Sequence, residues 1–260
     1  MSRYHSYINS SKEIISAYTG CEPLASYLKK HFGANKKFGS KDRKQIAHLC
    51  YCFFRLGKAF ASVATEEKIL IAVFLCSTGS NNVLANLKPE WNEKVTLSID
   101  EKLLLINYPF DYTQLFPFTE ELSQGIDAKE FALSHLIQPV LFLRIRPEQK
   151  EKVISKLKAA ALSFELIGES CIALPNATKI EEVILLDKEA VVQDYSSQRV
   201  ADFFPINIDG AIKTVWDCCA ASGGKSILAN DVLTNIQLTV SDIRENILFN
   251  LNKRFSAAGI

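Results

Sequence analysis

Apolar residues recur at the three- and four-residue spacing of amphipathic helices over roughly the first 135 residues. The pattern predicts one helix capped by Ser10 or Ser11 and a second that Gly33 ends. Asp42 favours the start of a third helix, because a carboxylate interacts well with the positive end of the helix dipole. Further helices are predicted near residues 66–76, 99–106 and 127–136. Since no strand-like alternation precedes Pro139, this part of the chain is predicted to be all-α.

The pattern then changes to short strands around one helix. Val140–Arg146 is rich in β-branched and other strand-forming residues, and Pro147 ends it. Residues 148–162 have helical periodicity, and two short strands follow at 163–167 and 171–174. Strand, helix, strand, strand predicts a small α+β subdomain of ferredoxin-like type.

A third pattern, beginning near Ser196, alternates strands with helices. Strands are predicted at 212–218 and 236–240, and helices from Ser226 and over 244–257. A β-α-β-α order implies a parallel sheet, here of Rossmann-like type. A doubly wound sheet needs more than two strands, so we expect this to be the N-terminal part of a longer protein. The predicted fold is multidomain, with an all-α domain at 1–137, an α+β subdomain at 138–195 and an incomplete α/β domain at 196–260.

Composition places the chain among ordinary globular proteins. It has 260 residues, of which 48% are hydrophobic, and 30 Lys and Arg against 29 Asp and Glu. These values exclude long disorder, collagen and a disulfide scaffold. The longest apolar run, Ile69–Cys76, is far shorter than the ~20 residues of a membrane-spanning helix. The N-terminus lacks the apolar segment of a secretory signal, so we expect a cytoplasmic monomer with no membrane association.

The near-neutral total hides a strong asymmetry of charge. Residues 1–60 hold 11 Lys and Arg against 3 Asp and Glu, a net charge of +8 that leaves −7 for the rest. Such segregation favours a polyanion-binding surface, and a solvated lysine-rich face is the alternative. The candidate RNA-phosphate contacts are Lys36, Lys37, Lys41, Arg43 and Lys44, together with Arg144 and Arg146 on one face of a predicted strand.

Seven cysteines raise the question of a metal site. No Cys-x-x-Cys occurs, and Cys50 and Cys52 have no second pair at ligand spacing. Both lie in an apolar helical stretch, where a free cysteine is an ordinary small hydrophobe. No metal site is predicted.

The chemistry-bearing stretch is Val215–Ser226, where a strand end leads through Gly223-Gly224 to a helix start. Such a turn directs backbone N–H groups and the positive end of a helix dipole at a ligand. A phosphate-binding P-loop would need Gly at 219, where this chain has Cys, and the dinucleotide fingerprint G-x-G-x-x-G is absent.

S-adenosylmethionine binding fits the same stretch. The glycines would let the methionine part approach, Lys225 would meet its carboxylate, and Asp242 after the second strand would bind the ribose hydroxyls. A simple tight turn without a ligand is the alternative. The predicted cofactor contacts are Cys219, Ala220, Ala221, Ser222, Gly223, Gly224, Lys225 and Asp242.

These residues also carry a family resemblance. Asp217-x-Cys-Ala-Ala-Ser-Gly-Gly-Lys-Ser226 resembles the D-x-C-A-A-P-G-G-K-[ST] signature of the Sun-type (Fmu) RNA cytosine-5 methyltransferases, which modify ribosomal RNA. Val192–Gln198 is similar to the family's V-Q-D-x-[AS]-S-Q segment, and Asp242 with Arg244 to its D-x-x-x-x-R segment, although this Arg is nearer. The basic stretch from Gly39 is similar to the helical antitermination-factor-like domain that many members carry.

The resemblance implies an S-adenosylmethionine-dependent ribosomal RNA methyltransferase. The sequence departs from the signature at Ser222, which replaces Pro and so restores a free φ and a backbone N–H. The family's catalytic cysteines lie in Thr-Cys-Ser and Pro-Cys-Ser-Gly segments, and neither occurs here. We therefore expect the catalytic residues beyond residue 260 and no methyl transfer by this chain alone. The alternative function is a non-catalytic RNA-binding or ribosome-assembly module.

Overall fold

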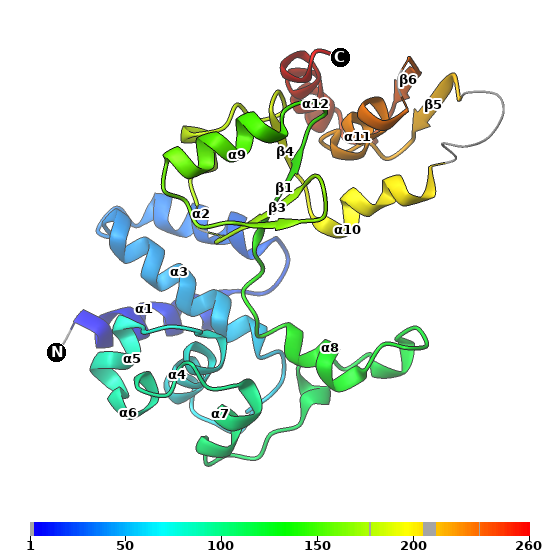
Figure 1. The fold of residues 1–260 in the computed structure, drawn as a ribbon. Coiled ribbons are helices and arrows are strands. Elements are labelled where there is room, and N and C mark those ends of the chain that lie inside the picture. Colours follow the sequence, from blue (N-terminus) through cyan, green and yellow to red (C-terminus); the bar gives the residue numbers. More distant parts are fainter. Residues whose placement is uncertain (1–2, 177, 205–211, 234) are drawn as a thin grey trace. The chain divides into compact units, whose positions relative to one another are not determined.

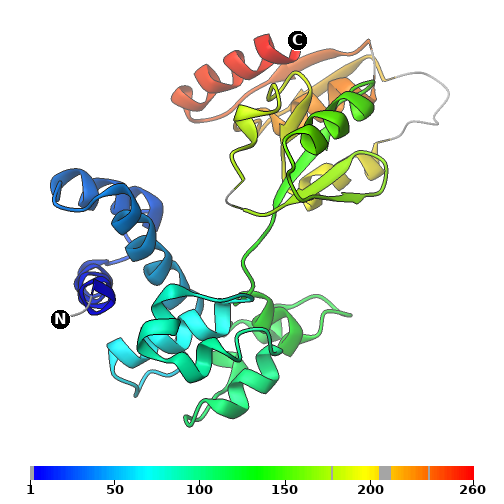
Figure 2. The same ribbon diagram turned by 60° about the vertical axis from the view of Figure 1, so that its left-hand side comes forward.

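The computed structural model describes residues 3–176, 178–204, 212–233 and 235–260. The chain is a mixed α/β protein that divides into two compact units, Met1–Gln138 and Pro139–Ile260, here called unit 1 and unit 2 (Figure 1). An extended segment after the last helix of unit 1 leads to the first strand (Figure 2). Each unit has its own hydrophobic core.

Every regular element among the described residues of unit 1 is a helix. The α-helices are α1 (Arg3–Ala17), α2 (Leu24–Ala34), α3 (Ser40–Arg55), α4 (Thr65–Cys76), α5 (Asn82–Leu87), α6 (Pro89–Asn92), α7 (Ile99–Leu105) and α8 (Ala128–Ser134). Two single-turn 3-10 helices, η1 (Tyr112–Gln114) and η2 (Thr119–Glu121), lie between α7 and α8.

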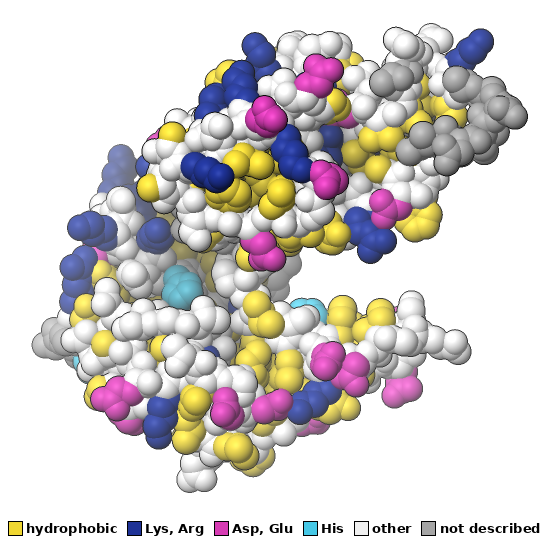
Figure 3. All heavy atoms as spheres, in the orientation of Figure 1, with side chains coloured by type: hydrophobic (Ala, Val, Ile, Leu, Met, Phe, Trp, Pro, Cys, Tyr) yellow, Lys and Arg dark blue, Asp and Glu magenta, His cyan; other side chains and the backbone are white. Residues whose placement is uncertain are grey.

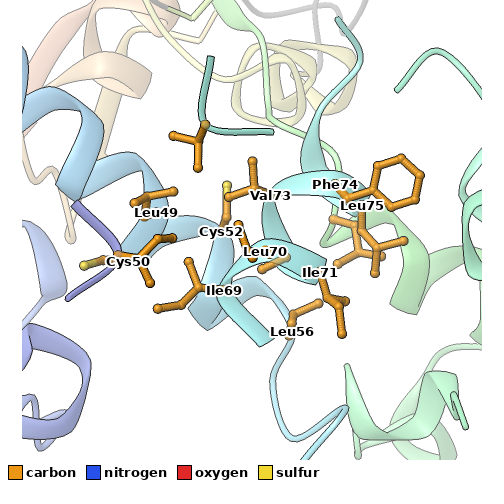
Figure 4. Packing of buried hydrophobic residues seen from close by; sticks show 14 of the residues in the cluster. Leu49, Cys50, Cys52, Leu56, Ile69, Leu70, Ile71, Val73, Phe74 and Leu75 are labelled. Carbon is orange, nitrogen blue, oxygen red and sulfur yellow. The ribbon is translucent and has the colours of Figure 1, made fainter. Parts of the chain in front are cut away.

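Helix α4 forms the centre of this unit. Each residue from Ile69 to Leu75 is at most 6% exposed, as expected of a helix that is apolar on all sides (Figure 4). Phe74 stacks on Trp91 with ring centroids 5.0 Å apart. The eight-residue apolar run of the sequence is thus a buried core helix. Among the described residues, no helix is both long and apolar enough to cross a lipid bilayer.

The helical predictions are confirmed for α3, α4, α7 and α8 within a few residues. Two boundaries were wrong, because α1 begins at Arg3 rather than at Ser10 or Ser11, and Gly33 lies inside α2. Ser11 is fully buried and donates to the Tyr7 carbonyl at 2.8 Å, so it bonds back along the helix instead of capping it.

Unit 2 begins with a four-stranded antiparallel sheet in the order β2-β3-β1-β4. The strands are β1 (Leu141–Ile145), β2 (Glu165–Ile167), β3 (Cys171–Leu174) and β4 (Ala190–Val192), and α9 (Lys150–Ala159) joins β1 to β2. The register pairs Leu143 with Ile172 on one side and with Val192 on the other. The 3-10 helix η3 (Ile180–Glu182) lies between β3 and β4. The first three strands match the predicted positions, whereas β4, only three residues long, was missed.

The two faces of this sheet pack against different elements. Leu143 and Ile145 point to the core that α9 completes with Val153 and Leu157. By the period of two, Arg144 points to the opposite face, where Val191 of β4 packs with residues of later helices.

The remaining elements follow the predicted β-α-β-α order. After α10 (Tyr195–Gln198) and η4 (Arg199–Phe203) come β5 (Thr214–Asp217), α11 (Gly224–Val232), β6 (Gln237–Val240) and α12 (Glu245–Ala258). Strands β5 and β6 pair in parallel, with Val215 opposite Leu238, so the predicted parallel pairing is confirmed. The loop from Cys218 to Gly223 therefore lies at the carboxyl edge of this sheet, beside Ser241 and Asp242.

Candidate functional site

The loop between β5 and α11 is held by backbone bonds to the residues that follow β6. The Ala220 N–H donates to the Ser241 carbonyl at 3.0 Å, and the Ser241 N–H donates to the Asp217 carbonyl at 3.0 Å. The Ser226 hydroxyl donates to Asp217 Oδ2 at 2.6 Å, which fixes the first turn of α11 to the strand end. Asp217 and Ser226 of the predicted signature therefore stabilise the loop by a hydrogen bond between its two ends.

Gly223 is required by the conformation of the loop. Its φ of +83° lies in the left-handed region, and an added Cβ would stand 3.0 Å from the Phe255 ring and 3.1 Å from Leu251. Gly224 has ordinary space around it, with its nearest contact to Gln193 at 3.8 Å. Gly223 is thus needed for the turn and for packing on α12, and the approach of a ligand to the glycines stays a prediction.

Asp242 anchors this loop. Its carboxylate accepts the Ala221 N–H at 2.9 Å and the Arg244 N–H at 3.0 Å, and the Arg244 guanidinium donates to it at 3.1 Å. These hydrogen bonds, those from Arg244 foremost, lower the pKa of Asp242 to about 2. The nearer Arg244, a departure from the resembled segment, is therefore an ion-pair partner of Asp242. A contact of Asp242 with a ribose stays a prediction.

A pocket of about 220 Å³ opens beside the loop. Its lining residues are Val192, Gln193, Asp194, Ser197, Asp217, Cys219, Ala220, Ala221, Ser222, Gly224, Lys225 and Arg254. Six of the eight predicted cofactor contacts are among them, and Gly223 and Asp242 are not. The site prediction missed Asp194 and Arg254, although the resemblance at 192–198 pointed to the first of them.

The 192–198 segment forms one side of this pocket and is held in place by hydrogen bonds of two glutamines. Gln193 Oε1 accepts the Arg144 Nε–H at 2.9 Å, and the Gln198 amide donates to the Gln193 carbonyl at 2.8 Å. Both glutamines are only 7% exposed. Their buried amides fix the backbone that presents Asp194 and Ser197 to the pocket.

Two adjacent cysteines begin the loop after β5. Cys218 and Cys219 are both exposed, so neither packs beneath the strand. A side-chain hydrogen bond with Cys218 raises the pKa of the Cys219 thiol. A raised pKa leaves little thiolate at neutral pH, which agrees with a place in the loop rather than a role as nucleophile.

Arg144 and Arg146 do not form an RNA-facing surface. Their guanidinium groups both pair with Asp231 of α11 at 2.6 Å, and Arg146 also donates to the carbonyls of Asp187 and Ala258. Arg144 is only 4% exposed. The prediction that these two arginines contact RNA is therefore wrong, because Arg144 is buried and all their guanidinium nitrogens except Arg144 Nη2 donate to groups inside unit 2.

The basic residues predicted in unit 1 do share one region. Lys36, Lys37, Lys41 and Lys44 are exposed around the α2–α3 connection, and Figure 3 shows Lys and Arg side chains gathered along that end of unit 1. Arg43 is half-buried, and its Nε–H donates to the Phe38 carbonyl at 2.8 Å. Four of the five predicted contacts are thus presented to solvent, and Arg43 holds the turn before α3.

Helix α1 adds a residue that the sequence did not single out. Arg3 pairs with Asp42 at 2.8 Å, and the Tyr7 hydroxyl donates to the same carboxylate at 2.6 Å. Arg3 and Tyr7 also line a hollow beside Lys37 and Phe38. The basic surface therefore extends from α3 onto the start of α1.

Within the ranges that the structure describes, no group of three or more His, Cys, Asp or Glu side chains is placed to hold a metal ion. Cys50 and Cys52 are buried in the core of unit 1, and burial raises the pKa of Cys50 to about 12.

Comparison with known proteins gives evidence on the fold alone. No protein-family model and no curated protein sequence matches the chain. Among solved structures, the chain is similar to the crystal structure of PH0851, with a TM-score of 0.58 and 13% sequence identity. The match covers 100% of this chain and 68% of that one. The structural similarity supports the mixed α/β architecture, and at 13% sequence identity it says nothing about activity.

Proposed function

We propose that the pocket beside the β5–α11 loop binds S-adenosylmethionine, and that the chain forms part of an RNA cytosine-5 methyltransferase. The mixed charge of the pocket supports this most directly, because Asp194 and Asp217 line it together with Lys225 and Arg254. S-adenosylmethionine carries a carboxylate, an ammonium and a sulfonium. Lys225 is the partner for the carboxylate, and the two aspartates suit the positive groups.

The same charges argue against a nucleoside triphosphate. A P-loop surrounds its phosphates with N–H donors and a lysine, and two carboxylates in the pocket wall would repel them. The loop also lacks the glycine that the P-loop needs at position 219.

The position of the pocket supports a cofactor site. In open parallel sheets, ligands bind outside the carboxyl ends of the strands, and the loop after β5 and Asp242 after β6 both lie there. About 220 Å³ is below the size of pockets that enclose a whole cofactor. We therefore assign the methionine end to this pocket and the ribose to the neighbourhood of Asp242.

The resemblance to the Sun-type enzymes is in keeping with the arrangement of unit 2. The strand order β2-β3-β1-β4, antiparallel throughout, is that of a ferredoxin-like sheet, although a 3-10 turn stands in place of its second helix. The parallel β5–β6 pair joined through α11 has the form of a Rossmann-like start. Within this proposal, RNA, and ribosomal RNA by the resemblance, is the substrate that unit 1 would hold through its basic surface.

Isothermal titration calorimetry with S-adenosylmethionine and S-adenosylhomocysteine tests the cofactor site. We expect both to bind the full chain, and Asp242→Ala to weaken binding about tenfold or more, because it removes hydroxyl contacts and the loop anchor. Asp202→Ala, which breaks a surface ion pair with Arg199, is the matched control. Affinity unchanged by Asp242→Ala would remove Asp242 from the site, and ATP binding in place of both ligands would favour a P-loop.

A non-catalytic RNA-binding module is the second candidate, and the exposed lysines around the α2–α3 connection favour it. A methyl-transfer assay with radiolabelled cofactor and ribosomal RNA separates the two in part. We expect no transfer by this chain, since it contains neither family cysteine segment. Cofactor binding without transfer supports the methyltransferase proposal, whereas RNA binding without cofactor binding supports the module.

A further inference from the structure

Arg254 of α12 joins the β5–α11 loop to a turn outside the parallel strands. Its Nη1 donates to the Ser222 carbonyl at 2.8 Å and to the Ser222 hydroxyl at 3.0 Å. Its Nε and Nη2 donate to the carboxylate of Asp187 at 3.0 and 2.7 Å. All three nitrogens of the guanidinium are thus engaged, and the planar group links two segments in a fixed geometry.

Ser222 has a use in this link that proline would lack. Its hydroxyl supplies a second acceptor for Arg254, whereas a proline would offer only the carbonyl. The neighbours on either side, Ala221 and Gly223, have φ values of +47° and +83°. Arg254 therefore binds the residue between two positions of positive φ. In a chain with proline at 222, the proline ring would restrict the backbone at that residue instead.

The backbone of Asp187 is fixed by hydrogen bonds within unit 2. It lies in the turn before β4 with a φ of +62°, and its N–H donates to the Ala190 carbonyl at 2.8 Å. Its carbonyl accepts a hydrogen bond from Arg146, which is paired with buried Asp231. The turn is thus a rigid support, tied to the antiparallel sheet and to α11.

We infer that Arg254 is a positioning residue, which sets the conformation of the cofactor loop from the Asp187 turn through Ser222. This inference rests on the proposed cofactor site and adds the residue that holds the loop in shape. Arg254 acts through Ser222, because each of its three guanidinium nitrogens donates to Ser222 or Asp187. The arrangement makes the geometry of the loop depend on the turn before β4, so the antiparallel sheet affects cofactor binding through Arg254 as well as through Val192 in the pocket wall.

Two measurements on the full chain test this role. Hydrogen-exchange mass spectrometry of the peptide covering residues 219–225, without ligand, should show faster exchange in Arg254→Gln than in the wild type. Calorimetry with S-adenosylhomocysteine should show about tenfold weaker binding by Arg254→Gln, since hydrogen bonds to a charged group are lost. Arg199→Gln is the control, because among the described residues Arg199 has its ion pair with exposed Asp202, and it should change neither readout.

A second substitution at position 222 separates a positioning role from general stability. In a Ser222→Pro background the proline ring already restricts the loop. Adding Arg254→Gln there should weaken binding only about threefold, compared with about tenfold in the wild-type background. A merely structural role would give the same loss in both backgrounds, and that result would overturn the inference. Unchanged exchange and unchanged affinity in Arg254→Gln would overturn it as well.

Ser222→Ala covers the case in which Arg254→Gln fails to fold. It removes one of the two acceptors, and we expect faster exchange of the loop with a loss of affinity of about threefold. Wild-type values in Ser222→Ala would then count against the inference. If the wild type binds no S-adenosylhomocysteine, the proposed function fails, while the exchange comparison still decides whether Arg254 holds the loop.

Discussion

At the scale of single residues, Asp231 is a buried carboxylate of unit 2 that pairs with two arginines. It receives both Arg144 and Arg146 at 2.6 Å, and its side chain is 3% exposed. Arg144 Nη2 is buried with no partner among the described residues, so this arginine already has an unmet donor. Removing Asp231 would leave the buried Arg144 and the partly buried Arg146 without their counter-charge, and loss of one partner of a buried ion pair is costly.

Asp231→Ala should therefore lower the free energy of unfolding of unit 2 by about 3–5 kcal/mol. Urea denaturation followed by circular dichroism measures the change, and hydrogen exchange of β1 and α11 assigns it to this unit. Asp202→Ala, which removes an exposed partner of Arg199, should cost less than about 1 kcal/mol. Equal effects of the two substitutions would show that the buried pairs contribute no more than a surface pair.

At the scale of elements, α1 and the start of α3 are joined through one carboxylate. Asp42 accepts the Gly39 N–H at 3.1 Å at the start of α3, and Tyr7 and Arg3 reach it from α1. The hydrogen bonds from Tyr7 and Arg3 lower the pKa of Asp42 to about 2. Asp42 thus has a second role, attaching α1, besides the helix-start role that its position in the sequence predicts.

A lowered pKa makes this attachment sensitive to acid. Because the folded state holds the proton less tightly than the unfolded state, Asp42 stabilises unit 1 fully above its ordinary pKa of 3.8. That contribution is lost as the pH falls from there through about 2. Asp42→Asn should therefore be less stable than the wild type at pH 6, and the difference should shrink toward pH 2. Thermal unfolding between pH 2 and 6 measures it, and a constant difference would contradict the pKa assignment.

The pattern of apolar and polar residues located the longer elements of the chain. It missed elements that are too short to show a period and helix turns whose sequence is mostly polar. Helix α4 and strand β1 stand out because their apolar runs are long. Strand β4 has only three residues, too few for periodicity to register, and is fixed by pairing with β1. The start of α1 was missed because its first turns are polar, although Tyr7 and Ile8 are buried against the rest of unit 1.

At the scale of the whole molecule, the separation of charge along the chain is the feature on which the proposed RNA binding rests. The first 60 residues carry +8, and exposed lysines of this stretch lie around the α2–α3 connection. If they contact RNA phosphates, each contact releases counterions, and affinity then falls steeply with salt.

Lys41→Ala with Lys44→Ala should lower the slope of log affinity against log salt by about 1.4 for a single-stranded RNA. Fluorescence anisotropy of the full chain with a labelled oligonucleotide measures the slope between 50 and 200 mM salt, a range of about fourfold. Lys94→Ala with Lys129→Ala changes two lysines of unit 1 that lie outside the basic first 60 residues, and it should leave the slope unchanged. Equal slopes for both double variants would indicate that the basic surface is only solvated.

The sequence by itself determined the order of the longer helices and strands, the glycine-dependent turn at 223 and the uneven distribution of charge. These depend on neighbours a few residues apart, such as the spacing of apolar positions or the φ that a single glycine permits. Only the tertiary structure decided that Arg144 and Arg146 are internal, that Asp242 anchors the loop and that Arg254 clamps Ser222. Those roles depend on partners that the fold brings together, as Arg144 and Asp231 are 87 residues apart and Arg146 meets Ala258 across 112. A charged residue at a strand position has the same local pattern whether it faces RNA or a buried carboxylate, so burial and partner identity settle its role.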